Sequence, residues 1–81
     1  MFINKSDKGL NNVCGVKICI KRKELKYSQR ELADKLQLLG LDIDKNAIQR
    51  IEAGKRFVTD IELIYFAKAL NLSFDELLTQ I

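Results

Sequence analysis

The amino-acid sequence predicts a compact all-α fold of five helices in a single domain. Two observations favour this fold. Apolar residues recur at the spacing of helix faces, and a serine or threonine stands three positions before a glutamate at the start of several apolar segments. These capping patterns are Ser28-Gln29-Arg30-Glu31, Thr59-Asp60-Ile61-Glu62 and Ser73-Phe74-Asp75-Glu76. A length of 81 residues, 47% of them hydrophobic, suits one core and leaves no room for a second.

The first predicted helix extends from near Asn12, its candidate N-cap, to about Leu25. Residues 1–11 are polar and lack periodicity, so we expect a flexible or loosely docked N-terminal tail, followed by the domain over residues 12–81. The lysines and arginine of this helix interrupt a broad apolar stripe. The stripe is expected to consist of Val13, Val16, Ile18, Cys19 and Ile20.

The second predicted helix begins after Ser28 and ends at Gly40, which suits the left-handed conformation that follows a last helical turn. Its buried face is expected to consist of Leu32, Ala33, Leu36 and Leu39. The third predicted helix is short, from Lys45 to Ala53, with Asp44 as its cap and Gly54 as its end. Its inward side is expected to hold Ala47, Ile48 and Ile51.

The fourth predicted helix begins after Thr59 and continues to about Leu70. It is so apolar that we expect it to be the central helix of the core. The fifth predicted helix is short and begins after Ser73. Capping chemistry thus marks the start of each of the last four helices.

Several functional classes find no support in the composition. The sequence has no histidine, and it shows neither a metal-ligand cluster, a glycine-rich phosphate loop, nor a nucleophile with a nearby base. We therefore expect no enzyme, no metal and no cofactor. The longest apolar run, from Leu63 to Ala67, is too short to span a membrane. Cys14 and Cys19 point to different faces of one helix and are expected to be free, which suits a cytoplasmic protein.

Charge is unevenly distributed along the chain, although the net charge is only +3. Residues 17–30 contain six basic residues and one acidic residue, whereas residues 59–81 contain four acidic residues and one basic residue. Such a domain can present a cationic face to a polyanion. Charge alone is equally compatible with an ordinary solvated helix face.

The third predicted helix has a polar side made of Lys45, Asn46, Gln49 and Arg50. Asparagine and glutamine can form paired hydrogen bonds with adenine, and arginine and lysine suit the acceptors of guanine. The pattern therefore matches the chemistry of base edges in a major groove. Any amphipathic helix also turns polar residues outward, and by itself this simpler explanation is favoured.

The order of residues from Val13 to Leu78 resembles the Cro/repressor-type helix-turn-helix family of bacterial and phage transcriptional regulators. Three segments carry the resemblance. They are Ser28-Gln29-x-x-Leu32-Ala33-x-x-Leu36, Ile48-Gln49-Arg50-Ile51-Glu52-Ala53-Gly54-Lys55-Arg56, and Ala67-x-Ala69-Leu70-Asn71-Leu72-Ser73-Phe74-Asp75-Glu76-Leu77-Leu78. The resemblance implies a lambda-repressor-like DNA-binding domain whose third helix enters the major groove of DNA.

Roles for individual residues follow from the same resemblance. Base-reading positions correspond to Lys45, Asn46 and Arg50, with Gln49 as a fourth. Phosphate contacts are expected from Gln29, Arg30, Lys55 and Arg56. Arg22 and Glu52 match a buried structural ion pair that joins the first and third helices.

The chain departs from the family in two places. The turn from Gln37 to Asp42 is longer than usual, which indicates either an extended second helix or a bulging loop. A proline that often follows the third helix is replaced by Phe57 and Val58.

The function expected from these observations is sequence-specific binding of double-stranded DNA by a transcriptional repressor, acting as a homodimer on a two-fold symmetric site. Leu77, Leu78 and Ile81 are candidates for the dimer surface, although they equally suit the core. The alternative is a protein-interaction module, such as an antitoxin or anti-repressor, that uses the same fold to bind a regulatory protein partner.

Overall fold

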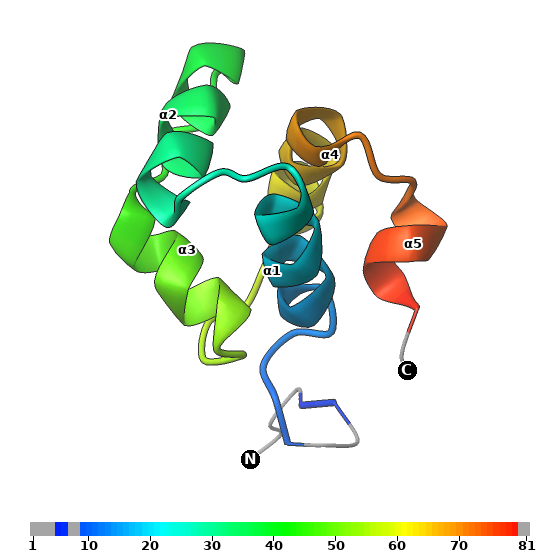
Figure 1. The fold of residues 1–81 in the computed structure, drawn as a ribbon. Helices are drawn as coiled ribbons and strands as arrows, with labels where there is room; N and C mark the ends of the chain where they lie inside the picture. Colours follow the sequence, from blue (N-terminus) through cyan, green and yellow to red (C-terminus); the bar gives the residue numbers. More distant parts are fainter. Residues whose placement is uncertain (1–4, 7–8, 80–81) are drawn as a thin grey trace.

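The computed structural model describes residues 5–6 and 9–79, and its secondary structure in this part is entirely helical (Figure 1). The helices are α1 (Gly15–Glu24), α2 (Gln29–Leu39), α3 (Lys45–Glu52), α4 (Asp60–Leu70) and α5 (Phe74–Leu78). The predicted all-α fold of five helices is confirmed. α1 packs against α3, α4 and α5, and α2 packs against α3 and α4, so that α3 and α5 lie on opposite sides of α1 (Figure 1).

The helix starts follow the capping chemistry of the sequence. Ser28, Thr59 and Ser73 each accept a backbone N–H from the glutamate three positions later, and that glutamate accepts the N–H of the cap. Asp44 caps α3 by accepting the N–H of Ala47 at 2.8 Å. These bonds satisfy donors that a helix start leaves free, so the predicted starts of α2 to α5 are confirmed.

Four helices end with a residue in the left-handed conformation. These residues are Lys26 (φ 63°), Gly40 (φ 110°), Gly54 (φ 74°) and Asn71 (φ 55°). In each case the next residue donates its N–H to a carbonyl five positions earlier, as Leu41 does to Leu36 at 2.9 Å. Glycine and asparagine suit this conformation, whereas lysine pays a steric penalty.

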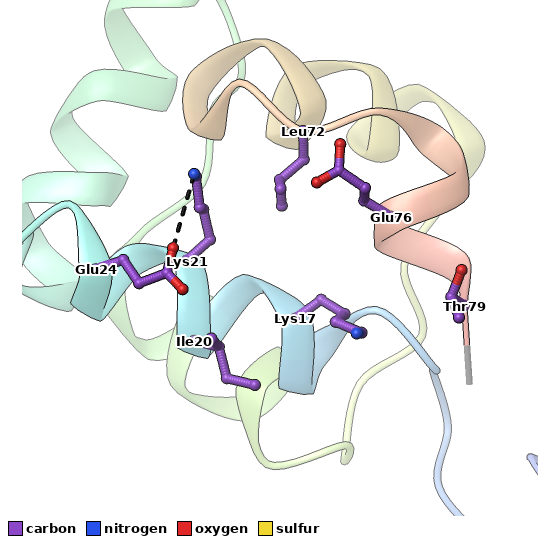
Figure 2. A pocket seen from close by; sticks show the side chains of 7 residues that line it. All are labelled: Lys17, Ile20, Lys21, Glu24, Leu72, Glu76 and Thr79. Carbon is purple, nitrogen blue, oxygen red and sulfur yellow. Dashed lines mark ion pairs between the residues drawn. The ribbon is translucent and has the colours of Figure 1, made fainter. Parts of the chain in front are cut away.

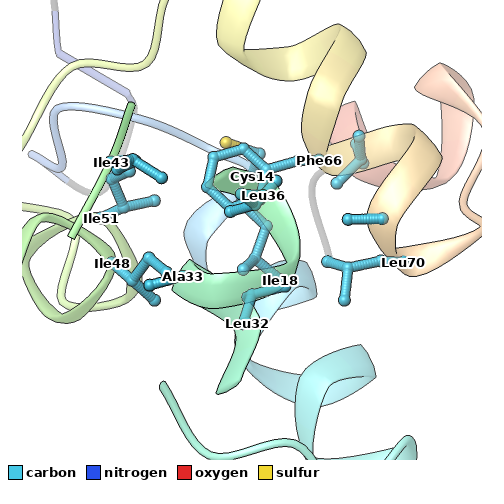
Figure 3. Packing of buried hydrophobic residues seen from close by; sticks show 12 residues of the cluster. Cys14, Ile18, Leu32, Ala33, Leu36, Ile43, Ile48, Ile51, Phe66 and Leu70 are labelled. Carbon is cyan, nitrogen blue, oxygen red and sulfur yellow. The ribbon is translucent and has the colours of Figure 1, made fainter. Parts of the chain in front are cut away.

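The core draws side chains from all five helices and from the loop before α3 (Figure 3). Its largest member is Phe66 of α4, which is fully buried, as is Leu77 of α5. The core residues are Cys14, Ile18, Leu32, Ala33, Leu36, Ile43, Ile48, Ile51, Phe66, Ala69, Leu70 and Leu77. Cys14 and Cys19 are both free, as expected, and burial raises the pKa of the Cys14 thiol to about 11.

The predicted apolar stripe of the first helix is wrong in part. Val16 and Ile20 are 48% and 46% exposed, and the side that faces the core instead carries Cys14, Ile18 and Arg22. Hydrophobicity could not reveal this rotation, because an arginine occupies an inward position and takes its partner from another helix. The helix also begins at Gly15 rather than next to Asn12, although the Asn12 side chain accepts the N–H of Gly15 at 2.8 Å.

Two further burial predictions need correction. Leu39, the last residue of α2, is 44% exposed, whereas Leu32, Ala33 and Leu36 of the predicted face are buried. α4 contacts three helices, but only one of its sides is in the core. Phe66, Ala69 and Leu70 are buried there, whereas Ile61 and Ile64 are 63% and 44% exposed.

The long connection between α2 and α3 is anchored at both ends. Helix α2 extends through Gln37 to Leu39, so part of the extra length is helical. The remainder turns at Gly40, and the side-chain amide of Gln37 donates to the carbonyl of Ile43 at 2.8 Å. Ile43 itself is buried in the core. These anchors fix the start of α3 relative to α2.

Candidate nucleic-acid interface

The side chains of Lys45, Asn46, Gln49 and Arg50 are exposed on α3, away from the buried Ile48 and Ile51. α3 lies at the edge of the molecule beside α2 (Figure 1). Within the described residues, none of these four side chains forms a hydrogen bond or an ion pair. Their donors and acceptors are therefore accessible to an external partner.

Opposite this exposed side, Glu52 anchors the last turn of α3 to α1. Its carboxylate oxygens accept Nε and Nη2 of Arg22 at 2.7 and 3.0 Å. The two side chains are only 7% and 10% exposed. The guanidinium of Arg22 also donates to the carbonyl of Tyr27 at 2.8 Å, so the arginine organises the end of α1 as well.

The electrostatics of Glu52 reflect two opposing effects. Burial raises the pKa of its carboxyl group, but hydrogen bonds from Arg22 and Gln29, together with the charge of Arg22, lower it. The net pKa lies below its usual value of 4.5, so Glu52 is ionised at neutral pH. The hydrogen bond to Glu52 correspondingly holds the pKa of Arg22 above its usual value.

Gln29 adds α2 to the same network. It is the first residue of α2, and its side-chain amide donates to Oε1 of Glu52 at 3.0 Å. One carboxylate thus connects the end of α1, the start of α2 and the end of α3. Arg30, the next residue, is exposed. The first backbone N–H groups of a helix point outward without internal partners, so this start of α2 favours an anion.

The segment that follows α3 contains one exposed cation and one paired cation. Lys55 is exposed, whereas Arg56 donates Nη2 and Nη1 to the two carboxylate oxygens of Glu62 at 2.8 and 3.1 Å. Glu62 is the capping-box residue of α4 and also accepts the N–H of Thr59. Hydrogen bonding from Arg56 lowers the pKa of Glu62. No sequence pattern indicates this pair, because Arg56 precedes the helix that carries Glu62.

Residues just before α1 also contact this segment. Asn11 donates its backbone N–H to the carbonyl of Gly54 at 2.8 Å, and its side-chain amide to that of Lys55 at 3.0 Å. Asn12 reaches the carbonyls of Ile51 and Arg56. The sequence offered no signal for these contacts, because polar residues without periodicity carry no information about distant partners.

A family model described as Helix-turn-helix matches residues 20–77, which is more than half of the chain. The chain belongs to the Cro/repressor-type helix-turn-helix family. Its α2 and α3, with the connection between them, lie inside the matched region. The family consists of DNA-binding transcriptional regulators. No match was found among curated proteins or among solved structures.

Among the hollows on the described surface of this helix-turn-helix protein, two lie between helices. One, of about 370 Å³, lies between α2 and the start of α3 and is lined by Arg30, Ala33, Asp34, Gln37, Asp44 and Lys45. The other, of about 320 Å³, lies between α1 and α5 (Figure 2). Lys17 and Lys21 line the second hollow from α1, and Glu76 lines it from α5. Both hollows carry charges of both signs.

Other properties of the described residues bear on the class of site. No group of three or more histidine, cysteine, aspartate or glutamate side chains is arranged there to hold a metal ion. Nor does that part of the chain contain a helix with the length and apolar character required to cross a bilayer. The exposed side of α3, with the cations that flank it, remains the candidate ligand-binding surface of this part of the chain.

Proposed function

We propose that this protein is a transcriptional repressor that binds a specific double-stranded DNA sequence with α3 in the major groove. The observation that carries the proposal is the free polar side of α3, which combines two amide and two cationic side chains. A scaffold of three helices holds this side outward through the carboxylate of Glu52. Membership of the helix-turn-helix family also supports DNA as the partner.

The proposed base contacts follow from the geometry of hydrogen-bond donors and acceptors. The amides of Asn46 and Gln49 each offer one acceptor and donor groups that match N6 and N7 of adenine. Lys45 and Arg50 offer only donors, which match O6 and N7 of guanine. All four side chains are exposed on a helix of eight residues, the size of segment that a major groove admits.

The proposed phosphate contacts flank α3 on both sides. Gln29 and Arg30 lie at the start of α2, where free N–H groups and the positive helix end attract phosphate. Lys55 follows α3 and is exposed. Arg56 has a smaller proposed share, because its bidentate pairing with Glu62 leaves a neutral pair that attracts an anion weakly.

We propose that the protein acts as a homodimer, since one short helix reads too few base pairs for useful specificity. α5 offers Phe74 and Leu78, which are 50% and 45% exposed, as apolar contacts for a second copy. Leu77 is buried in the core of its own chain, and Ile81 lies outside the described residues. The two free thiols suit the proposed location in the cytoplasm.

A duplex selected by the protein from a random pool, titrated at several salt concentrations, tests the proposal. Binding through phosphate contacts requires the affinity to fall steeply as salt rises, with a slope of about −0.9 per neutralised phosphate. Sequence-specific binding requires a random duplex to bind at least about a thousandfold more weakly. Absence of any salt-dependent duplex binding would refute the proposed function.

A second candidate function is a protein-interaction module such as an antitoxin or anti-repressor. One observation favours it: Ile61 and Ile64 lie on the outer side of α4 and are exposed, as is Phe57 just before that helix. Apolar side chains of this kind suit contact with a protein partner. If this is the function, substitution of Ile61 and Ile64 by serine would abolish binding of the protein partner in cells. The affinity for a DNA duplex would stay unchanged.

A further inference from the structure

Asn12 connects the start of α1 with the end of α3. Its side-chain oxygen accepts the N–H of Gly15 at 2.8 Å, while its amide nitrogen donates to the carbonyls of Ile51 at 3.0 Å and Arg56 at 2.7 Å. The side chain is half-buried, where water competes less well for these bonds. A single amide thus fixes the distance between two helices and the loop that follows the second.

Asn11 and Leu10 extend this connection. The carbonyls of Gly54 and Lys55 accept the backbone and side-chain N–H groups of Asn11 at 2.8 and 3.0 Å. Leu10 covers Gly54 so closely that a β-carbon there would lie 2.7 Å from a methyl carbon of the leucine. We call Leu10, Asn11 and Asn12 the N-terminal clasp. Every carbonyl from Gly54 to Arg56 is bonded by the clasp.

The clasp holds the part of the chain from which two proposed DNA contacts extend. Arg50 belongs to the last turn of α3, and Lys55 lies in the segment after it. Paired hydrogen bonds to a base lose strength steeply when a donor is misaligned. A small rotation of the end of α3 would therefore weaken base contacts more than it would weaken contacts with phosphates, which depend less on direction.

We infer that Asn11 and Asn12 are positioning residues for DNA binding, because they set the orientation of the end of α3 without touching the duplex. This inference rests on the proposed function. It also goes beyond the family assignment, since the clasp lies outside residues 20–77, which the family model matches. Four hydrogen bonds to the carbonyls of residues 51 and 54–56 hold the end of α3 and the segment after it, in addition to the ion pair of Glu52 with Arg22.

Charge-neutral variants test the inference without altering attraction to DNA. Asn12→Ser keeps a short oxygen acceptor for the N–H of Gly15 but cannot reproduce both donations to α3 and its loop. Asn11→Ala removes only the exposed bond to Lys55 and is the milder change. Asn71→Ala serves as a control, because alanine in a left-handed position destabilises the chain at the end of α4, away from the clasp.

The affinities of these variants for the selected duplex and for a random duplex are measured well below each thermal midpoint. We expect the Asn11→Ala, Asn12→Ser double variant to bind the selected duplex about tenfold more weakly, with a loss of less than about threefold for the random duplex. Asn71→Ala should lower the thermal midpoint without changing either affinity. If the clasp is purely structural, the double variant should also have a lower thermal midpoint and unchanged affinities for both duplexes. That result would overturn the inference.

The outcomes also separate the inference from the proposed function. A wild-type chain that binds no duplex overturns both. A wild-type chain that selects a sequence, together with clasp variants of unchanged selectivity, overturns the inference alone. If the double variant does not fold, Asn11→Ala decides the matter, because a loss of selectivity in that variant supports the clasp and unchanged selectivity contradicts it.

Discussion

Gly15 and Ile51 bring the backbones of α1 and α3 into direct contact: a β-carbon at Gly15 would lie 2.1 Å from the carbonyl oxygen of Ile51. The same oxygen accepts the side-chain amide of Asn12, which in turn accepts the N–H of Gly15. Glycine is required here by the close approach of two helix backbones and not by a positive φ. The contact sets how far α3 extends from the body of the protein.

The first prediction concerns this contact. Gly15→Ala should destabilise the protein by about 3 kcal/mol, because a methyl group forces two backbones apart and breaks the bonds of Asn12. Unfolding by urea, followed by circular dichroism, measures the loss. Lys23→Ala, an exposed change in the same helix, should alter the free energy of unfolding by less than about 0.5 kcal/mol. Equal stability of the two variants would contradict the packing of α1 on α3.

The starts of the last four helices, and the glycines that end α2 and α3, could be predicted from sequence because capping is local. A hydroxyl at Ser28 and a carboxylate at Glu31 are enough to form their reciprocal bonds, whatever lies elsewhere in the chain. The rotation of α1 is different. It depends on Arg22 meeting Glu52 and on Gly15 meeting Ile51, and neither contact belongs to the periodicity of α1. The hydrophobic stripe therefore gave the inward side only in part: Ile18 is buried, whereas Val16 and Ile20 are exposed.

The same distinction applies to the candidate site. The exposed polar side of α3 follows from its own residues, since Ile48 and Ile51 fix which side faces inward. The pairing of Arg56 with Glu62 and the clasp at Asn12 connect residues whose spacing obeys no helical or strand rule. Such contacts cannot be predicted from the spacing of residues in the sequence and are found only in the folded structure. Arg22 with Glu52 was an exception, because a family resemblance implied it.

The second prediction concerns Lys26, which adopts a left-handed conformation with φ 63° after α1. Lys26→Gly should stabilise the protein by about 1 kcal/mol, because glycine adopts this conformation without a steric penalty. The shift of the urea midpoint measures the gain. Lys26→Ala removes the same charge but keeps the β-carbon, so it should give no comparable gain. A stabilisation that is equal in both variants would indicate relief of charge repulsion instead.

The third prediction concerns the buried pair of Arg22 and Glu52. Arg22→Met should destabilise the protein by about 3–5 kcal/mol, because it leaves a carboxylate buried without its cation. The double variant Arg22→Met, Glu52→Leu should recover most of this loss, since neither charge then remains in the interior. Denaturant unfolding of the single and double variants supplies the comparison. A double variant no more stable than Arg22→Met would show that the unpaired carboxylate is not the source of the loss.

The fourth prediction is the pH dependence of that stability. The folded pKa of Glu52 lies below its usual value of 4.5, so protonation favours the unfolded chain. The contribution of Glu52 should be complete above about pH 5 and should be lost as the pH falls toward its lowered pKa. Glu52→Gln should therefore show a shallower loss of stability in acid than the wild type. The Glu52→Gln variant should still lose some stability in acid, because the pKa of Glu62 is lowered too. Parallel curves for wild type and Glu52→Gln would contradict the lowered pKa.

The fifth prediction separates base contacts from phosphate contacts in the proposed DNA complex. Arg50→Ala and Asn46→Ala should each weaken binding to the selected duplex by about 1–3 kcal/mol and relax the preferred sequence, because each removes a side chain that matches a base edge. Lys55→Ala should weaken binding to all duplexes alike and reduce the salt slope by about one. Selection from a random pool and salt titrations provide both readouts.

Because these three residues are exposed, the thermal unfolding midpoints of the variants should stay close to that of the wild type. Identical selected sequences for the wild type and both α3 variants would show that α3 does not read the bases.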